Sequence, residues 1–187
     1  MLKERVTESI PIRRKSVDIA VLVALTTDVM ERQARALGIA LTVSIGEDVP
    51  DTASMDRDKV AWAITNLVGS AIRHTRRPGG SVVAQVTYDP ARWTLCISVR
   101  DDGPGIPPDR LERLLNRTPW HPGGALALLL VEDIARAHGG IMKIESRTDA
   151  SNHFTAVSLT IPLHPDHVLL GDPPRAAPAA AGGKDDA

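Results

Sequence analysis

Three long segments of the chain carry apolar residues at helical spacing, over 17–37, 55–75 and 125–138. The first follows Ser16, whose hydroxyl suits an N-terminal cap, and precedes Gly38, a common residue just after the end of a helix. We expect its buried stripe to consist of Leu22, Leu25, Val29 and Ala36. A shorter helix is expected after Pro108, and Gly139 ends the third long one.

Five shorter segments have apolar residues at every second position, as a strand with one buried face does. They cover 39–45, 82–88, 93–100, 141–146 and 154–161. The first directly follows a helix and is expected to be of the antiparallel type. Short turns separate the second segment from the third and the fourth from the fifth, which predicts two hairpins.

In this order, about five strands and about three long helices predict an α/β (α+β) two-layer sandwich. The sheet is expected to be mixed but mostly antiparallel, with the helices covering one of its faces. We expect this domain to span 16–164, after an N-terminal connector over 1–15. The Ala-, Pro- and Gly-rich stretch 165–187 cannot bury enough apolar surface to offset the entropy of ordering, so a disordered tail is expected there.

The composition of the chain mainly excludes certain partners and locations. A formal net charge of -1 gives no broad attraction to nucleic acid or to an acidic membrane surface. The apolar stretches are shorter than the ~20 residues that a membrane-spanning helix needs. The only cysteine, Cys96, excludes a disulfide framework and suits a reducing compartment. We therefore expect a cytoplasmic protein that contacts neither nucleic acid nor membrane.

Candidate chemistry begins directly after the strand 93–100, in a segment that reads Asp-Asp-Gly-Pro-Gly-Ile over 101–106. A carboxylate at the end of a strand can accept a hydrogen bond from an exocyclic amine, which favours adenine over guanine. Gly103 and Gly105 let the backbone turn sharply and approach a flat ligand without a Cβ clash. Because Asp-Gly-Pro-Gly by itself is often only a turn, its meaning depends on a second group.

That second group lies on the helix predicted over 55–75, where Asn66, Ser70 and Arg73 share one face. An amide oxygen is a suitable Mg2+ ligand, and a guanidinium neutralises phosphate charge. We take Asn66 as a candidate metal ligand. A polar helix face is usually only solvated, but combined with Asp101 this one indicates a site for a purine triphosphate.

These two segments, with Gly-Gly-Ala-Leu-Ala-Leu over 123–128 and His-Gly-Gly over 138–140, resemble the ATP-binding domain of sensor histidine kinases. Its superfamily is shared with gyrase, MutL and a heat-shock chaperone. The resemblance covers 17–162 and implies a Bergerat-type fold that binds ATP and Mg2+. It also implies that Asp101 binds the adenine amino group, that His74 flanks the base, and that Asn66 and Arg73 face the phosphates. The nucleotide-binding positions carried over are Asn66, Ser70, Arg73, His74, Asp101, Gly103, Gly105, Ile106, Gly123, Gly124 and Leu126.

Three positions depart from the family pattern. The resemblance makes Ser70 the second candidate metal ligand, because it stands where the family's helix repeats Asn and supplies the principal Mg2+ ligand. A hydroxyl is shorter than an amide and binds metal more weakly. Ala125 and Ala127 replace the second and third glycines of Gly-x-Gly-Leu-Gly-Leu, and their methyl groups crowd the phosphates and disfavour a positive φ. Losing one polar contact costs about 1 to 3 kcal/mol, and ~3 kcal/mol is roughly a hundredfold in affinity.

The resemblance implies a two-component histidine kinase, in which a γ-phosphoryl group passes to a His on a helical hairpin. None of the 6 His residues lies on such a hairpin, so we expect the phosphoacceptor to come from another domain or chain, or the partner to be a response regulator. No residue of this chain is assigned a catalytic role. Two alternatives stay open: a degenerate kinase-like regulatory module with weak or no ATP turnover, and an anti-sigma-type serine kinase acting as a lone domain.

Overall fold

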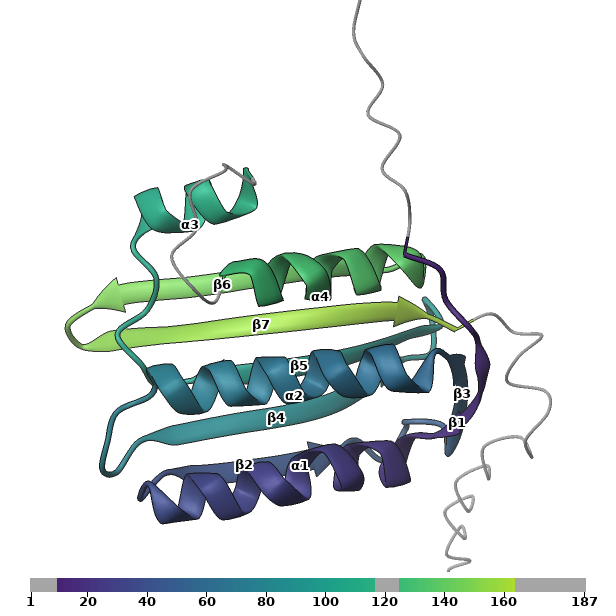
Figure 1. Cartoon of the computed structure of the whole chain (residues 1–187), viewed down its shortest axis with the longest axis horizontal. Coiled ribbons are helices and arrows are strands. Elements are labelled where there is room, and N and C mark those ends of the chain that lie inside the picture. Colours follow the sequence, from purple (N-terminus) through teal and green to yellow (C-terminus); the bar gives the residue numbers. More distant parts are fainter. Residues whose placement is uncertain (1–9, 117–124, 164–187) are drawn as a thin grey trace, which may run out of the picture.

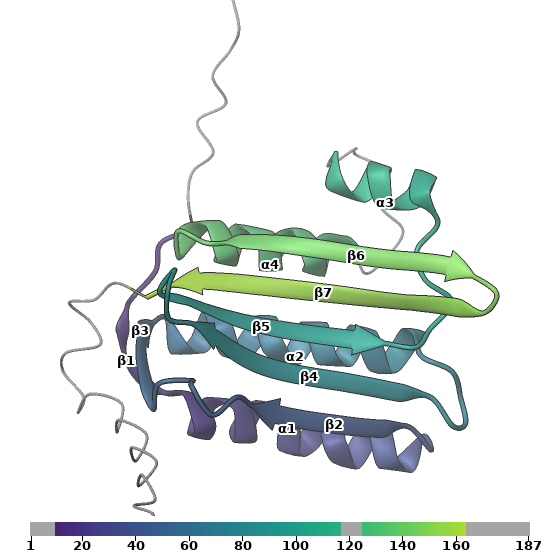
Figure 2. The same cartoon turned by 180° about the vertical axis from the view of Figure 1, so that it is seen from behind.

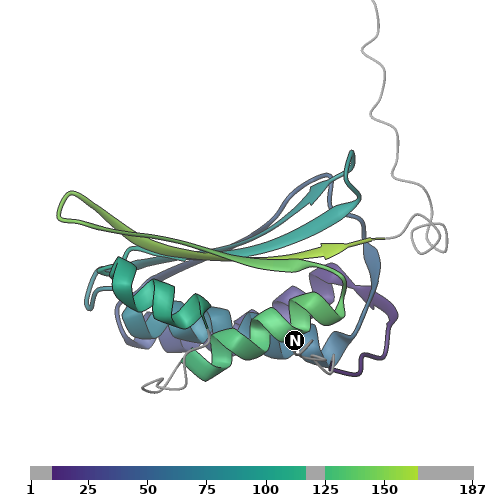
Figure 3. The same cartoon turned by 90° about the horizontal axis from the view of Figure 1, so that it is seen from above.

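The computed structural model describes residues 10–116 and 125–163, and these form two layers (Figure 1). One layer is a five-stranded sheet, and the other consists of helices that lie on the same face of that sheet, as the view from above shows (Figure 3). The helices of this layer are α1 (Ile19–Ala36), α2 (Arg57–His74) and α4 (Ala125–Ala137). The two-layer arrangement confirms the predicted fold class. A shorter helix, α3 (Pro108–Leu115), follows the loop after the hairpin 81–101.

The sheet has the order β2-β4-β5-β7-β6 and is mostly antiparallel (Figure 2). Its strands are β2 (Ala40–Ile45), β4 (Ser81–Asp89), β5 (Thr94–Asp101), β6 (Ile141–Asp149) and β7 (Asn152–Pro162). Both predicted hairpins are present, because β4 pairs with β5 and β6 pairs with β7, each antiparallel. The antiparallel expectation for β2 is wrong: β2 runs parallel to β4, with Leu41 opposite Val82. The chain between them crosses over through α2, and such a crossover returns it in the same direction.

Side chains on alternate positions of β4, β5 and β7 form the core with the helices. The buried ones are Val82, Ala84, Val86, Leu95, Ile97, Val99, Val157, Leu159 and Ile161. The side of α2 that packs against them carries Val60, Ala63, Ile64, Leu67, Val68, Ala71 and Ile72. Because this apolar side fixes the rotation of α2, the polar residues Asn66 and Ser70 are turned away from the sheet core.

Two short strands, one before α1 and one before α2, were not predicted. β1 (Lys15–Asp18) pairs antiparallel with β3 (Thr52–Met55), and Ser16 lies opposite Ser54 in this pair. Ser16 is therefore not the helix cap that the sequence predicted. The carboxylate of Asp18 accepts from the backbone N–H of Val21 at 2.8 Å and caps α1.

The buried stripe predicted for α1 is also wrong in part. Leu22 is buried, but the side chains of Leu25 and Val29 are more than half exposed. The buried residues of α1 are Ile19, Leu22, Val23, Thr27 and Ala34. Because α1 lies at the edge of the helical layer, α2 and the sheet cover only one side of it (Figure 1).

Several predicted features lie outside the described residues. They are the connector before residue 10, the glycines Gly123 and Gly124, and the tail over 165–187. Within 10–116 and 125–163, no helix is both long enough and apolar enough to cross a membrane.

Candidate nucleotide site

The loop after β5 lies against the last turn of α2. A Cβ added at Gly103 would lie 2.4 Å from the carbonyl oxygen of His74, so only a glycine lets these two segments approach so closely. Thr75, the residue after α2, donates its hydroxyl hydrogen to the carboxylate of Asp102. The structure thus brings together two segments that sequence analysis singled out separately.

Asp101 is the last residue of β5 and lies at this contact between the loop and α2. It is only 6% exposed. Its Oδ1 accepts a hydrogen bond from the backbone N–H of Gly103 at 2.9 Å. No other described residue donates a hydrogen bond to its side chain, which leaves the second carboxylate oxygen as a buried acceptor in need of a donor. Burial raises the pKa of Asp101 above its ordinary value, while the hydrogen bond from Gly103 acts in the opposite direction.

The far end of the same loop is fixed against β6. Gly105 has a φ of +77, and a Cβ there would lie 2.0 Å from the carbonyl oxygen of Arg147. Both the backbone conformation and the close approach therefore require glycine at this position. The backbone N–H of Ile106 donates to the hydroxyl of Ser146 at 2.6 Å. The predicted positions Gly103, Gly105 and Ile106 thus all help to hold the loop in one shape.

Asn66, Ser70 and His74 form a row of polar residues along α2, four residues apart. The Asn66 amide nitrogen donates to the carbonyl of Trp62 at 2.8 Å, so its Oδ1 is the atom left to accept from, or to ligate, another group. Nδ1 of His74 donates to the carbonyl of Ser70 at 2.8 Å, and the Ser70 hydroxyl lies 3.4 Å from that nitrogen. Two oxygens of the kind that bind Mg2+ therefore lie one helical turn apart.

Arg73 lies differently from this row. One guanidinium nitrogen of Arg73 is 3.4 Å from the point where a Cβ on Gly69 would be, and the sulfur of Met30 on α1 is 4.0 Å from the same point. The guanidinium therefore extends back along α2 on the side of α1. The structure brings Asn66, Ser70 and His74 into line, while a contact of Arg73 with phosphate stays a prediction.

The predicted phosphate-binding segment is 123–128, and the structure describes it only from Ala125, the first residue of α4, onwards. Gly123 and Gly124 lie outside the described residues, and Leu126 is 76% exposed in the first turn of the helix. Ala127 lies within α4, and Trp93 is the only non-glycine residue with a positive φ in the described ranges. Ala127 therefore needs no strained backbone, and only the bulk of its methyl group distinguishes it from glycine.

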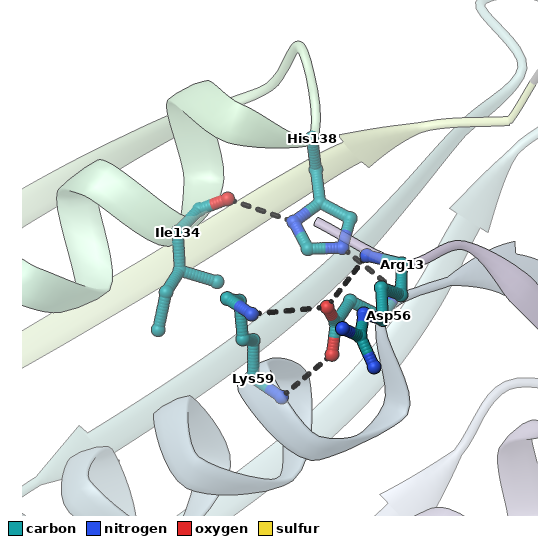
Figure 4. A network of polar contacts seen from close by, with 5 residues as sticks. All are labelled: Arg13, Asp56, Lys59, Ile134 and His138. Carbon is teal, nitrogen blue, oxygen red and sulfur yellow. Dashed lines mark hydrogen bonds and ion pairs between the residues drawn. The ribbon is translucent and has the colours of Figure 1, made fainter. Parts of the chain in front are cut away.

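A buried polar network at the other end of α2 was missed by sequence analysis (Figure 4). His138 is fully buried; its Nε2 accepts from the backbone N–H of Asp56 at 3.0 Å, and its Nδ1 donates to the carbonyl of Ile134 at 2.8 Å. The Asp56 carboxylate caps α2 through the N–H of Lys59 at 3.2 Å and accepts from the N–H of Arg13 at 2.8 Å. The network joins the N-terminal segment, the start of α2 and the end of α4.

Opposing effects set the titration of this network. Burial raises the pKa of Asp56, but hydrogen bonds from Arg13 and Lys59 and the Lys59 charge outweigh it and lower the pKa from 3.8 to about 2. Burial lowers the pKa of His138. Asp56, the second residue of the helix predicted over 55–75, was the one sequence signal available, since Asp is a preferred cap at the start of a helix. Its contact with a residue 82 positions later had no such signal.

Comparison with known proteins places this geometry in a family. Residues 55–165 match the model of the "Histidine kinase-, DNA gyrase B-, and HSP90-like ATPase" family, which covers more than half of the chain. The chain is 40% identical over 116 residues to the histidine protein kinase DivJ of Caulobacter vibrioides, covering 58% of this chain and 18% of DivJ. It is 31% identical over 125 residues to the adaptive-response sensory kinase SasA of Rippkaea orientalis, covering 63% of this chain and 31% of SasA. The chain thus spans less than a third of each of these relatives.

Solved structures agree with these relatives in fold. Full-length ShkA in complex with AMPPNP superposes with a TM-score of 0.71 at 22% identity, over 83% of this chain and 32% of ShkA. The mycobacterial sensor histidine kinase MprB gives a TM-score of 0.66 at 24% identity, over 82% of this chain and 99% of that structure. The chain therefore belongs to the histidine kinase-, DNA gyrase B- and HSP90-like ATPase family, and within it is a domain of the sensor histidine kinase ATP-binding type.

Proposed function

We propose that this chain is the ATP- and Mg2+-binding catalytic domain of a two-component histidine kinase, which phosphorylates a His supplied by another domain or chain. The observation that carries the proposal is the buried carboxylate of Asp101, with one oxygen held by Gly103 and the other without a donor among the described residues. The amino group of adenine supplies such a donor. Guanine has a carbonyl oxygen at the corresponding position, which can only accept, so the site selects adenine.

The other candidate residues would hold Mg2+, the base and the phosphates. Oδ1 of Asn66 and the hydroxyl of Ser70 are the groups that would hold Mg2+, and His74 would flank the base. The backbone at Gly123, Gly124 and Leu126, where α4 begins, would hold the phosphates, because the N-terminal end of a helix attracts anions. Arg73 would neutralise phosphate charge after turning away from Gly69. When bound, ATP supplies the phosphoryl group that is transferred, and Mg2+ neutralises its charge.

The chain's own contribution is to bind and orient, because the acceptor nucleophile belongs to the partner. That partner is a helical-hairpin domain with its own His, and a response regulator would receive the phosphoryl group next. Such a kinase draws on the cellular ATP pool, so we propose that the domain works in the cytoplasm.

Calorimetric titration with ATP, with and without Mg2+, tests the proposal. We expect micromolar, Mg2+-dependent binding by the wild type, no binding of GTP, and loss of ATP binding in Asp101→Asn. Asp102→Asn is the matched control, since the neighbouring carboxylate already has Thr75 as its partner and an amide can keep that contact. Transfer from labelled ATP to a separately purified hairpin domain then tests the kinase activity.

A second candidate function is a regulatory module with weak or no ATP turnover. The observation that favours it is Ser70, whose short hydroxyl lies against His74 at the position of the principal Mg2+ ligand. Absence of saturable binding at millimolar ATP would reject the catalytic proposal and leave this one. Equal loss of binding in Asp101→Asn and Asp102→Asn would reject the assigned role of Asp101.

A further inference from the structure

The loop 101–106, which we term the base loop, is attached to both neighbouring parts of the fold. On the side of α2 and β4, the Asp102 carboxylate accepts from the hydroxyl of Thr75, and the backbone N–H of Asp102 donates to the carbonyl of Ser81, the first residue of β4, at 3.2 Å. On the side of the hairpin β6–β7, the N–H of Ile106 donates to Ser146. His153 adds a further contact from that side.

His153 lies half-buried at the start of β7, and both of its ring nitrogens have partners. Nδ1 lies 2.8 Å from the carbonyl oxygen of Gly103. Because a carbonyl only accepts, Nδ1 carries the hydrogen and donates it. Nε2 of the neutral ring then has a lone pair, and the guanidinium of Arg76 donates to it. The two neighbours thus define a single tautomer of His153.

Gly103 links the His153 contact to Asp101. The carbonyl of Gly103 accepts from His153, while the N–H of the same Gly103 donates to Oδ1 of Asp101 at 2.9 Å. Both backbone polar groups of Gly103 are therefore engaged, and the glycine has no side chain to hold it otherwise. The N–H and the C=O of Gly103 belong to the two peptide groups that meet at its Cα, so a shift of Gly103 away from His153 would also break the only hydrogen bond that the described residues donate to the Asp101 side chain.

We propose that His153 is a positioning residue for adenine recognition: with Arg76 it fixes Gly103, and Gly103 keeps the free oxygen of Asp101 directed at the base. The inference rests on the proposed function and names a determinant of base affinity within it. His153 touches no reacting atom, and its part is hydrogen bonding by a neutral ring. The effect is therefore confined to the base end of the nucleotide.

The test compares His153→Ala, which removes both hydrogen bonds, with His153→Asn, whose amide nitrogen takes the place of Nδ1. We expect His153→Ala to weaken ATP and ADP binding by the same factor, about tenfold, with or without Mg2+. His153→Asn should recover most of that loss because it still donates to Gly103. Arg76→Ala should produce a smaller loss, since Arg76 acts only through the ring.

A second measurement makes the inference testable apart from nucleotide binding. Hydrogen exchange at the Gly103 amide reports its bond to Asp101 directly, and we expect about tenfold faster exchange in His153→Ala but not in His153→Asn. Unchanged exchange and unchanged affinity in His153→Ala would overturn the inference while leaving the proposed function intact. Equal losses in His153→Ala and His153→Asn, matched by equal falls in melting temperature, would also overturn it. If the wild type binds no ATP, the proposed function fails, and the exchange comparison alone decides whether His153 holds the base loop.

Discussion

The backbone N–H of Asp56 donates a hydrogen bond to Nε2 of His138 at 3.0 Å, across 82 positions of sequence. This bond joins the residue that caps α2 to the residue that follows α4. The guanidinium of Arg14 also donates to the carbonyl of His138 at 2.7 Å, so the N-terminal segment is held at the same point. The helix with the candidate Mg2+ ligands and the helix with the candidate phosphate site are thus fixed relative to each other by one buried imidazole.

The first prediction concerns the pH dependence of stability. The pKa of His138 is lowered below 6.5, chiefly by burial, so the folded protein binds this proton less readily than the unfolded chain. The contribution of His138 to the free energy of unfolding is fully present above pH 6.5. It falls as the pH drops below that value, by at most about 1.4 kcal/mol per pH unit. Urea unfolding at a series of pH values between 8 and 5 (roughly the range where His titrates) measures it. In His138→Gln, whose amide oxygen can replace Nε2 as acceptor, the slope should be smaller; an identical slope would contradict the assignment.

The second prediction concerns Asp56. Its pKa in the folded protein is about 2, against an ordinary value of 3.8, which corresponds to about 2 kcal/mol of stability at neutral pH. That stability is present above pH 3.8 and is lost as the pH falls toward 2. Asp56→Ala should therefore cost at least about 2 kcal/mol in urea unfolding, because it also removes the cap of α2. Asp58→Ala, in the first turn but with a 93% exposed side chain, is the control and should change stability by less than about 0.5 kcal/mol.

The third prediction separates backbone strain from steric contact. Gly79 and Gly105 both have left-handed backbones, with φ of +88 and +77, but a Cβ on Gly79 would meet no atom within 4 Å. Gly79→Ala should cost only the conformational penalty of about 1 to 2 kcal/mol. Gly105→Ala should cost more and weaken ATP binding, because its methyl group must displace the Arg147 carbonyl. Equal unfolding free energies in the two variants would show that the base loop accommodates a side chain.

The pattern of apolar residues was sufficient to predict most of the fold. The strands around Ile97 and Leu159 alternate cleanly because one face of the sheet is buried beneath helices and the other is not. β1 and β3 were missed because each has only four residues, too few to establish a period. The parallel pairing of β2 with β4 depends on a crossover, and the exposure of Leu25 depends on the position of α1 at the edge of its layer. Neither property is encoded in local spacing.

The candidate site was predictable to the extent that it depends on motifs. Asp101 and Gly103 stand in a short segment whose chemistry can be inferred from residue types, and the structure joins it to the end of α2. His153 and Arg76 could not be found in this way, because 77 positions separate them and neither residue type is unusual at a turn. Long-range polar contacts of this kind leave no periodic signal.

The fourth prediction concerns the stability of Asp101→Asn. Burial raises the pKa of Asp101, so its charged form at neutral pH is disfavoured by folding, and the stability contributed by this group increases as the pH falls through the raised pKa toward the ordinary value of 3.8. Asn removes the charge and keeps an oxygen for the N–H of Gly103. We therefore expect a melting temperature at neutral pH equal to or above that of the wild type, together with lost ATP binding. A large fall in melting temperature would mean that the lost binding reflects unfolding.

The last prediction is that Ser70→Asn strengthens Mg2+-dependent ATP binding. Asn66 already shows the arrangement that such a side chain adopts on α2: its amide nitrogen donates to the carbonyl four residues earlier, and its oxygen stays free. An Asn at position 70 can donate in the same way to the carbonyl of Asn66, which places a second amide oxygen one helical turn further along. Restoring one contact to a charged group is worth about 1.5 to 3 kcal/mol, which is a gain of at least about tenfold in affinity.

ATP titrations of Ser70→Asn with and without Mg2+ test this prediction. The gain should appear only with Mg2+, because the added oxygen acts on the metal and not on the base, and it should vanish in the double variant Ser70→Asn, Asp101→Asn. Ser70→Ala is the matched control. If the Ser70 hydroxyl is a metal ligand, its loss weakens Mg2+-dependent ATP binding. If the chain is a regulatory module, Ser70→Ala leaves binding unchanged. A gain of equal size without Mg2+ would place the effect outside the metal site and exclude Ser70 from the set of Mg2+ ligands.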